Sequence, residues 1–235
     1  MEEVIQVPKA KLNSGHQMPL LAMGTCSSSP QNPDQLTSIL IRAIEMGYRH
    51  FDTAVVYGSE EALGRAVAAA VERGLVASRD ELFITTKLWC TETEHHLVVP
   101  ALKRSLGTEN IVPFDMKGTW EGMENCCKLG LANSIGVSNF TSKKISQLLQ
   151  NATIPPAVNL VALRWVYQQG ACVVIVTSFN NERMKENLQI FNWELEEDEI
   201  AKIQQIPQRR GFKGAEFVHS NGPYKSVEEL WDGDI

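Results

Sequence analysis

The sequence lacks the features that would point to a membrane or a nucleic-acid partner. Its 235 residues contain no run that approaches the roughly 18 consecutive apolar residues of a membrane span. It has no long basic segment, and its formal net charge of -6 disfavours a polyanionic partner. The start, Met1 to Val4, is acidic, unlike a secretory signal. We therefore expect a cytoplasmic protein that binds neither nucleic acid nor membrane.

Cysteine is also scarce, and its spacing excludes a disulfide or metal framework. The five cysteines are Cys26, Cys90, Cys126, Cys127 and Cys172, an odd number without a CxxC pair. Cys126 and Cys127 are neighbours in a helical pattern, where successive side chains point about 100° apart, so they are unsuited to chelation. The His95-His96 pair has no acidic or thiol partner at helical spacing. We expect reduced thiols, as in a cytosolic protein, and no metal site.

One stretch, residues 48–61 (YRHFDTAVVYGSEE), has the residues of a proton-transfer site. It predicts a buried strand from His50 to Ala54, a loop, and a helix for which Ser59 would be the N-cap. The next strand pattern, residues 82–89, places Lys87 in an apolar and β-branched run, where a solvated charge is not expected. Asp52, Tyr57 and Lys87 would then meet at the carboxyl ends of parallel strands. The alternative is that Tyr57 merely packs.

These three residue types together suit the reduction of a carbonyl group. A free tyrosine has a pKa of about 10 and is a poor proton donor near neutrality. A nearby ammonium stabilises the phenolate, and a carboxylate can orient that ammonium. Such a tyrosine can protonate a carbonyl oxygen while a hydride arrives at the carbonyl carbon.

The order of strand and helix patterns predicts a parallel α/β fold. Strand patterns at 18–25, 50–54 and 82–89 alternate with helical patterns at 33–47 and 60–72. Further strands are expected at 132–139, 154–159 and 172–179, and further helices are expected at 97–106, 114–129, 141–150, 160–167, 182–191 and 196–206.

The alternation fails at two places. Residues 107–113 are too few and too polar to hold a strand between two helical patterns, and the strand at 154–159 runs directly into the helix at 160–167. We count about six strands where a (β/α)8 barrel of the TIM type needs eight. The chain has no linker or repeat, so we expect one incomplete barrel domain over residues 1–235.

The sequence resembles the aldo-keto reductases, and within them the plant enzymes related to codeinone reductase and the polyketide (chalcone) reductases. The matching blocks are residues 18–25, 48–61, 85–89 (TTKLW), 135–140 (IGVSNF), 178–187 and 217–235. The resemblance runs almost end to end, and it implies an NADPH-dependent reductase.

The resemblance also indicates where the two missing β units would lie. Relatives carry a fourth strand with a catalytic histidine after the Ser105-Leu106 position. After the Val158-Asn159 position they carry a cofactor-binding glutamine and a seventh strand with a stacking aromatic residue, and Leu160 stands where that glutamine would be.

The resemblance implies roles for residues that this chain retains. Tyr57 would donate the proton, Lys87 would assist the donation, and Asp52 would orient Lys87 and contact the cofactor. Ser138 and Asn139 would hold the nicotinamide carboxamide, with Gly24 and Thr25 beneath it, and Trp89 would wall the substrate pocket. The alternative for Ser138-Asn139 is a plain strand-to-helix turn.

The resemblance also implies a site for the adenosine end of NADPH at the start of a helix, where backbone N–H groups favour phosphate. Its residues would be Ser178, Phe179, Arg183, Glu186 and Asn187. The planar guanidinium of Arg183 suits a 2′-phosphate. Thr177 stands where many relatives have a lysine that touches the same phosphate, so we expect weak and modestly selective binding. The alternative is a surface helix of alternating charge.

Two hypotheses follow. The first is a monomeric NADPH-dependent reductase of a small aldehyde or ketone, with Tyr57, Lys87 and Asp52 as its acid group. The second is a catalytically impaired isoform, from alternative splicing or a faulty gene model, that binds nucleotide weakly or fails to fold. Because two β units are missing and unpaired strand edges invite aggregation, the sequence predicts a poorly soluble or molten chain without Tyr57-dependent turnover.

Overall fold

The computed structural model describes residues 6–26, 32–88, 95–104, 116–137, 142–156, 174–205, 214–215, 218 and 224–233. At their centre is a four-stranded parallel sheet with the order β5-β4-β3-β6. Its strands are β3 (Leu21–Gly24), β4 (His50–Asp52), β5 (Phe83–Thr85) and β6 (Val174–Val176). Gly24 pairs with Asp52, and Asp52 pairs with Thr85. Three strands therefore end at the same level.

An antiparallel hairpin, which the sequence did not predict, precedes the sheet. It consists of β1 (Lys9–Lys11) and β2 (Gln17–Pro19), and its turn contains Gly15 with a φ of 86°. The single strand expected at 18–25 is thus divided between β2 and β3. Leu12 and Met18 of the hairpin pack with Ala22, Phe83 and Ile175 on one face of the sheet.

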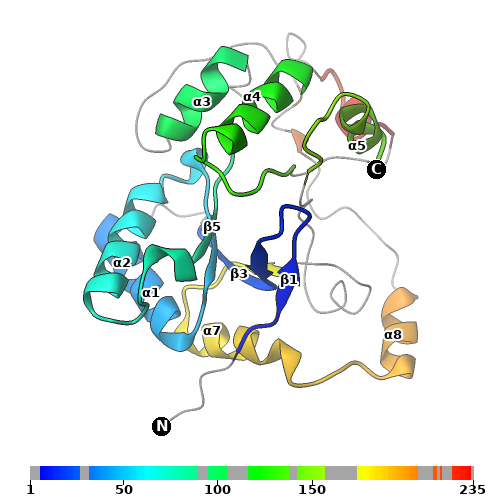
Figure 1. Ribbon diagram of the computed structural model, residues 1–235. Coiled ribbons are helices and arrows are strands. Elements are labelled where there is room, and N and C mark those ends of the chain that lie inside the picture. The colour runs from blue at the N-terminus through cyan, green and yellow to red at the C-terminus, as the bar shows by residue number, and fades with distance from the viewer. Residues whose placement is uncertain are drawn as a thin grey trace.

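The main core lies on the other face of the sheet, under the helices α1 (Pro33–Met46), α2 (Glu60–Glu72) and α7 (Asn181–Leu188). Helix α1 starts at the cap Asn32 and ends at Gly47, whose φ of 109° favours glycine. Its apolar stripe faces Leu21, Met23 and Phe51 of the sheet. Figure 1 shows α1 and α2 side by side next to the sheet.

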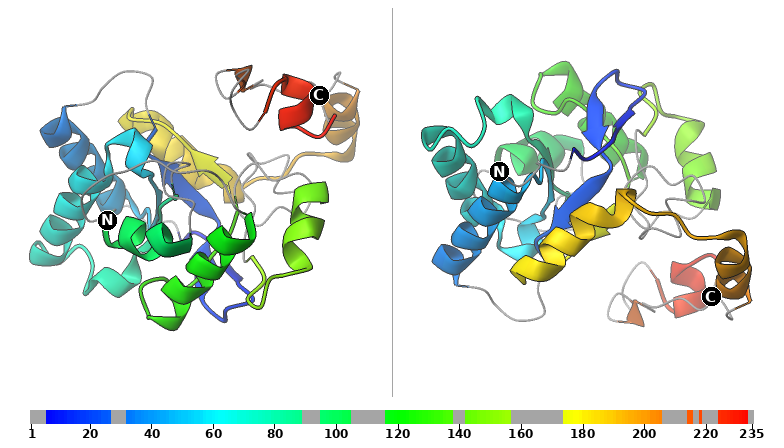
Figure 2. Two further views of the ribbon diagram at one scale, coloured as in Figure 1. Left: turned by 90° about the horizontal axis from the view of Figure 1, so that it is seen from above. Right: turned by 90° about the horizontal axis from the view of Figure 1, so that it is seen from below.

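A second core lies between α4 (Met116–Lys128) and α5 (Ser142–Leu149), which contribute Trp120 and Leu148 to a buried cluster. Helix α3 (His95–Arg104) lies beside α4, and the left view of Figure 2 shows both in front of the sheet. The side chains of α4 hold the segment after α5. The Trp120 Nε1 donates to the Ile154 carbonyl at 2.9 Å, and the Glu124 Oε1 accepts from the amides of Thr153 and Ile154 at 2.7 and 2.9 Å.

The two doubtful regions of the strand pattern are only partly described. In residues 132–137 the structure has a single bridge residue, Val137, and in residues 154–156 it has no strand. The predicted strand residues 138–139 and 157–159, the predicted helix 160–167 and the short link 107–113 lie outside the described residues. The described part therefore contains four of the eight strands of a complete barrel.

The chain closes with α8 (Glu197–Gln204) and the short α9 (Val227–Leu230). Lys144 of α5 attaches the last turn, because its Nζ donates to the Leu230 carbonyl at 2.6 Å and lies 3.6 Å from the Asp232 carboxylate. Among the described helices, none combines the length and the apolar character needed to cross a membrane. In the same residues no group of three or more histidine, cysteine and acidic side chains is placed to hold a metal ion.

Candidate functional site

Asp52, Tyr57 and Lys87 lie together at the carboxyl end of the sheet. Asp52 is the last residue of β4, Tyr57 ends the 3-10 turn η1 (Val55–Tyr57), and Lys87 follows β5 by two residues. The Lys87 Nζ donates to the Asp52 Oδ2 at 2.6 Å and to the Thr53 carbonyl at 3.1 Å. The same nitrogen lies over the Tyr57 ring, 4.9 Å from its centroid. A cation is therefore fixed next to the phenol by a carboxylate.

The Asp52 carboxylate is buried, with 7% of its side chain exposed. Burial raises the pKa of this carboxyl group, and Lys87 opposes the rise through a hydrogen bond and its charge. The Oδ1 atom has no hydrogen-bond partner among the described residues. An orphaned acceptor of this kind is costly unless a donor from a ligand or water reaches it.

Ser59 is the N-cap residue of α2, as the sequence predicted, but its side chain makes no hydrogen bond to an α2 amide. Instead its hydroxyl is buried between two threonines, 2.6 Å from the Thr25 Oγ1 and 2.7 Å from the Thr53 Oγ1. The Thr25 hydroxyl donates onward to the Asp52 carbonyl at 3.1 Å. The hydrogen-bonding capacity of these buried hydroxyls is therefore satisfied by one another, without a bond to the amides at the start of α2.

His50 is a second buried group at the site that the sequence analysis overlooked. Its Nδ1 lies 3.0 Å from the Pro19 carbonyl and its Nε2 lies 3.0 Å from the Thr85 Oγ1. Because a carbonyl only accepts, the Nδ1 carries the proton and the Nε2 accepts from Thr85. Burial, helped by the charge of Lys87 and opposed by the hydrogen bond to Pro19, lowers the pKa of His50 to about 4. The signal was available, because residues two apart in a strand share a face and His50 precedes Asp52 by two.

The segment predicted for the adenosine end lies at the start of α7, directly after β6. Arg183 and Glu186 are exposed, and Phe179 packs against the main core. The Asn180 Oδ1 already accepts from the amides of Glu182 and Arg183 at 3.0 and 3.1 Å, so two helix-terminal donors are satisfied internally. These two amides are therefore not free to bind a phosphate, which the site expected at this helix start relies on. The Ser178 Oγ accepts from the Asn180 amide at 3.3 Å.

Asn187 is turned toward the core. Burial raises the pKa of Tyr48 to about 12, and a hydrogen bond from the Asn187 side chain opposes this rise. The Tyr48 hydroxyl also donates to the Met184 carbonyl at 3.0 Å. Asn187 thus holds α7 against Tyr48, in the loop between α1 and β4.

Gly24 ends β3 next to Thr177, which follows β6. A Cβ placed on Gly24 would lie only 2.5 Å from the Thr177 Oγ1 and 3.1 Å from the Ile175 Cγ2. The glycine is therefore required by the close approach of the two strand ends. Trp89, Ser138 and Asn139, which the sequence predicts at the substrate pocket and the nicotinamide, lie outside the described residues.

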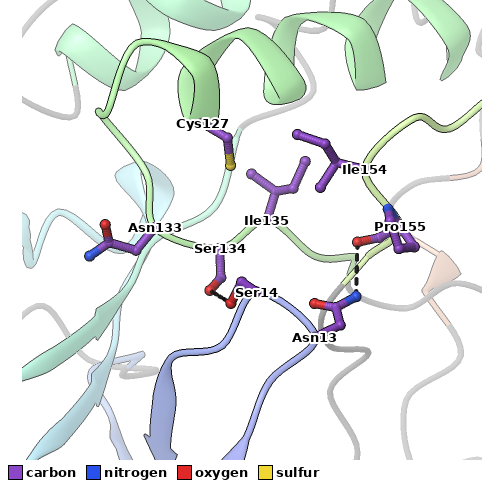
Figure 3. A pocket seen from close by; sticks show the side chains of 8 residues that line it. All are labelled: Asn13, Ser14, Cys127, Asn133, Ser134, Ile135, Ile154 and Pro155. Carbon is purple, nitrogen blue, oxygen red and sulfur yellow. Dashed lines mark hydrogen bonds between the residues drawn. The ribbon is translucent and has the colours of Figure 1, made fainter.

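A pocket of about 100 Å³ lies elsewhere, between the hairpin turn and the segment after α4. Figure 3 shows its lining, with Asn13 bonded to the Pro155 carbonyl and Ser14 bonded to Ser134. Asn13 and Ser14 precede β2, whereas Asp52 pairs with the last residue of β3. This pocket is therefore separate from the group at the strand ends.

Comparisons with known proteins match nearly the whole chain. The model of the Aldo/keto reductase family matches residues 20–161 and 158–208. Rhazimal reductase 2 of Alstonia scholaris is 42% identical and Protein REDOX 2 of Catharanthus roseus is 40% identical, each with 100% of both chains covered. A crystal structure of an aldo-keto reductase from Bombyx mori in complex with NADP has a TM-score of 0.78 and 28% identity, covering 86% of this chain and 93% of that chain. The resemblance and the barrel-type fold predicted from the sequence are confirmed.

The same comparisons bear on the missing units. The alignment with the Alstonia protein has 324 positions, 89 more than the 235 residues of this chain, although both chains are covered in full. At least 89 positions therefore face a gap in this chain. The family model matches in two pieces that meet at residues 158–161, where the sequence predicts the second missing unit.

Proposed function

This chain belongs to the aldo/keto reductase family, and on that premise we propose that it is an NADPH-dependent reductase of a small aldehyde or ketone, with Tyr57 as the proton donor. The observation that carries the proposal is the contact of Lys87 with both the buried Asp52 carboxylate and the Tyr57 ring. Relatives named as reductases of plant compounds, among them a 7-acetyl-epi-neemfruitin B aldo-keto reductase, favour a carbonyl of a specialised metabolite as the substrate.

In the proposed reaction Tyr57 gives its phenolic proton to the carbonyl oxygen. Lys87 stabilises the negative charge that develops on the phenol, because its ammonium is fixed beside the ring. Asp52 and the Thr53 carbonyl hold that ammonium in place. Bound NADPH would supply the hydride to the carbonyl carbon.

The residues present fit NADPH in part. The free acceptor Oδ1 of Asp52 suits a hydroxyl donor from a bound ligand, and Asp52, Gly24, Thr25, Ser138 and Asn139 would serve the nicotinamide end. The exposed Arg183 would pair with the 2′-phosphate, with Ser178, Phe179, Glu186 and Asn187 around the adenosine. Thr177 cannot add a charge there, so the preference for NADPH over NADH rests on Arg183.

A second candidate, an impaired reductase that retains weak nucleotide binding, is favoured by the 89 alignment positions without a residue. The catalytic histidine and the nicotinamide-binding glutamine of relatives fall within the missing units. The sequence alone predicts no Tyr57-dependent turnover. The structure, in which Asp52 holds Lys87 beside the Tyr57 ring, favours slow turnover that depends on Tyr57.

The two candidates are separated by NADPH oxidation with a panel of aldehydes, followed at 340 nm. We expect Tyr57→Phe to lower kcat by a factor of about 10² or more, because a general acid typically contributes 10²–10⁴. Tyr224→Phe is the matched control, since the ring of Tyr224 also has a lysine ammonium over it, that of Lys144. Equal rates for the wild type and Tyr57→Phe would support the impaired protein.

Nucleotide titration by fluorescence tests the cofactor assignment independently of turnover. Arg183→Ala should weaken NADPH binding by about tenfold to a hundredfold, the loss of one charge-assisted hydrogen bond, and should leave NADH binding unchanged. Lys185→Ala removes the same charge from the same helix and is the control. An equal loss for both nucleotides would contradict the role of Arg183.

A further inference from the structure

Three threonines stand at equivalent places at the carboxyl end of the sheet. Thr25, Thr53 and Thr86 each directly follow the last residue of β3, β4 and β5. Their hydroxyls converge on the start of α2. The Ser59 Oγ lies 2.6 Å from the Thr25 Oγ1 and 2.7 Å from the Thr53 Oγ1, while the Thr86 Oγ1 donates to the Glu60 Oε1 at 2.6 Å. We call Ser59, Glu60 and these threonines the strand-end clamp.

The hydroxyl protons of the clamp have a defined direction. The Thr25 hydroxyl donates to the Asp52 carbonyl, which can only accept. The Ser59 hydroxyl must therefore donate to Thr25, and the Thr53 hydroxyl must donate to Ser59. Thr25, Thr53 and Ser59 are 1–2% exposed. Removal of one of these hydroxyls would therefore leave its partner without a hydrogen bond, because water does not reach it freely. Ser59 is the only described residue that bonds to both of these threonines.

The residues of the clamp are close in sequence to, or bonded to, the acid group of Asp52, Tyr57 and Lys87. Thr53 follows Asp52, and its carbonyl accepts from the Lys87 ammonium. Thr86 immediately precedes Lys87, and the Thr25 amide and hydroxyl both donate to the Asp52 carbonyl. Ser59 follows Tyr57 by two residues. The clamp therefore fixes the backbone on which all three side chains stand.

We propose that Ser59 is a positioning residue, which through the strand-end clamp sets the placement of the Tyr57 phenol relative to the Lys87 ammonium. This inference rests on the proposed function. It also accounts for how the acid group is assembled in a chain that lacks two β units, since every member of the clamp lies within residues 25–86. None of these ties depends on the segments that are missing.

The kinetic test compares Ser59→Ala with Ser59→Thr, which retains the hydroxyl, at a temperature far below the unfolding midpoint. Ser59→Ala should lower kcat by about tenfold to a hundredfold, the usual result of a small misplacement of reacting groups, with KM and the Kd for NADPH changed less than twofold. Ser59→Thr should restore most of the rate. Glu61→Ala, which changes the exposed acid next to Glu60, is the control and should match the wild type. An unchanged kcat in folded Ser59→Ala would overturn the proposal.

A spectroscopic test separates this proposal from the proposed function. The chain has 4 tyrosines, so labelling each ring at the carbon that bears the hydroxyl gives few NMR signals, and Tyr57→Phe identifies that of Tyr57. We expect the Tyr57 signal to shift in Ser59→Ala and the Tyr48 signal to stay. A shift in a chain without turnover would support the clamp and reject the proposed function. An unmoved Tyr57 signal would reject the clamp.

A second pair of variants, at Thr86 and Glu60, tests the clamp even if the Ser59→Ala chain does not fold. Thr86→Val removes the hydroxyl that binds Glu60, whereas Glu60→Gln keeps an acceptor oxygen for it. Thr86→Val should lower kcat severalfold and shift the Tyr57 signal, and Glu60→Gln should do neither. The reverse order of the two variants would contradict the inference.

Discussion

At the scale of single residues, the site combines one buried acid and one buried base with opposite responses to pH. Asp52 has a pKa raised by burial, so its contribution to stability grows on acidification through that pKa. His50 has a pKa lowered to about 4, so the folded chain excludes a proton that the unfolded chain accepts. The contribution of His50 is therefore complete above about pH 6.5, its ordinary pKa, and is lost as the pH falls toward 4.

We predict that acid destabilises the protein between about pH 6.5 and pH 4 because of His50. The slope of the unfolding free energy against pH should approach about 1.4 kcal/mol per unit within this window. Urea denaturation at a series of pH values measures it. His50→Gln should flatten the slope even if it lowers stability at pH 7, and His96→Gln, on the exposed surface of α3, should not. A flat curve for the wild type would contradict the prediction.

The sequence predicted the acid group but not what holds it. Asp52, Tyr57 and Lys87 could be predicted because charged and phenolic side chains at the ends of apolar strands are rare. Ser59 was predicted as the N-cap of α2 and occupies that position, but its hydroxyl does not make the expected capping bond. Its bonds to Thr25 and Thr53 depend on how strands far apart in sequence are placed side by side, which no local pattern shows.

At the scale of elements, α4 holds the segment after α5 through a buried carboxylate. Glu124 is 4% exposed, and its Oε1 accepts from two backbone amides, while Lys128 stands 3.9 Å from its Oε2. A buried carboxylate that accepts several hydrogen bonds is stabilised in that position. This contact fixes Ile154 against the second core, where Trp120 and Leu148 also pack.

We predict that Glu124→Leu releases the 153–154 segment, whereas Glu124→Gln, which keeps the accepting oxygen, largely preserves it. The leucine variant should lose roughly 1–3 kcal/mol of stability, since two amides lose a partner and can only partly turn to water. Hydrogen exchange of the Thr153 and Ile154 amides is the direct measurement. Glu121→Leu, on the exposed side of the same helix, should leave both amides protected. If these two amides stayed as protected from exchange in Glu124→Leu as in Glu124→Gln and the wild type, the contact would be dispensable.

The helices were easier to predict than the strands. Helices α1, α2, α4 and α7 begin and end within two or three residues of their predicted limits, because a stripe of apolar residues marks each of them. The hairpin β1–β2 was missed because Lys9 and Lys11 leave no apolar alternation over three residues. The strands of the sheet have three or four residues and are shorter than the predicted runs, since an apolar run also includes the residues that lead into the next loop.

At the scale of the whole molecule, the two larger cores of the described residues are separate from each other. The main core joins α1, α2 and α7 to the sheet, and the second joins α4 and α5 to residues 132–154, and the two clusters have no residue in common. A complete barrel would link such parts through a continuous ring of strands. The prediction of a poorly soluble or molten chain concerns this weakened link, and it stays a prediction.

We predict that the two cores open independently. Leu148→Ala and Leu40→Ala should each cost about 2–5 kcal/mol in their own core, because each removes a buried leucine side chain. In native-state hydrogen exchange, Leu148→Ala should expose the amides of α4 and α5 while those of α1 and α2 keep their protection. A uniform loss of protection in both helix pairs would mean that the chain unfolds as one unit.

The position of β3 in the sheet has a consequence for folding of the chain during its synthesis on the ribosome. Its neighbours are β4, which follows it closely, and β6, which is synthesised much later. About 90 residues separate the end of β5 from β6, so at a synthesis rate of about 5–20 residues per second the nascent chain waits roughly 4–18 s for that strand. Throughout this interval the acid group can already assemble on β3, β4 and β5, while one flank of β3 stays open to any other chain on the same polysome. Pairing of two nascent chains through this flank would lower the yield of the folded protein.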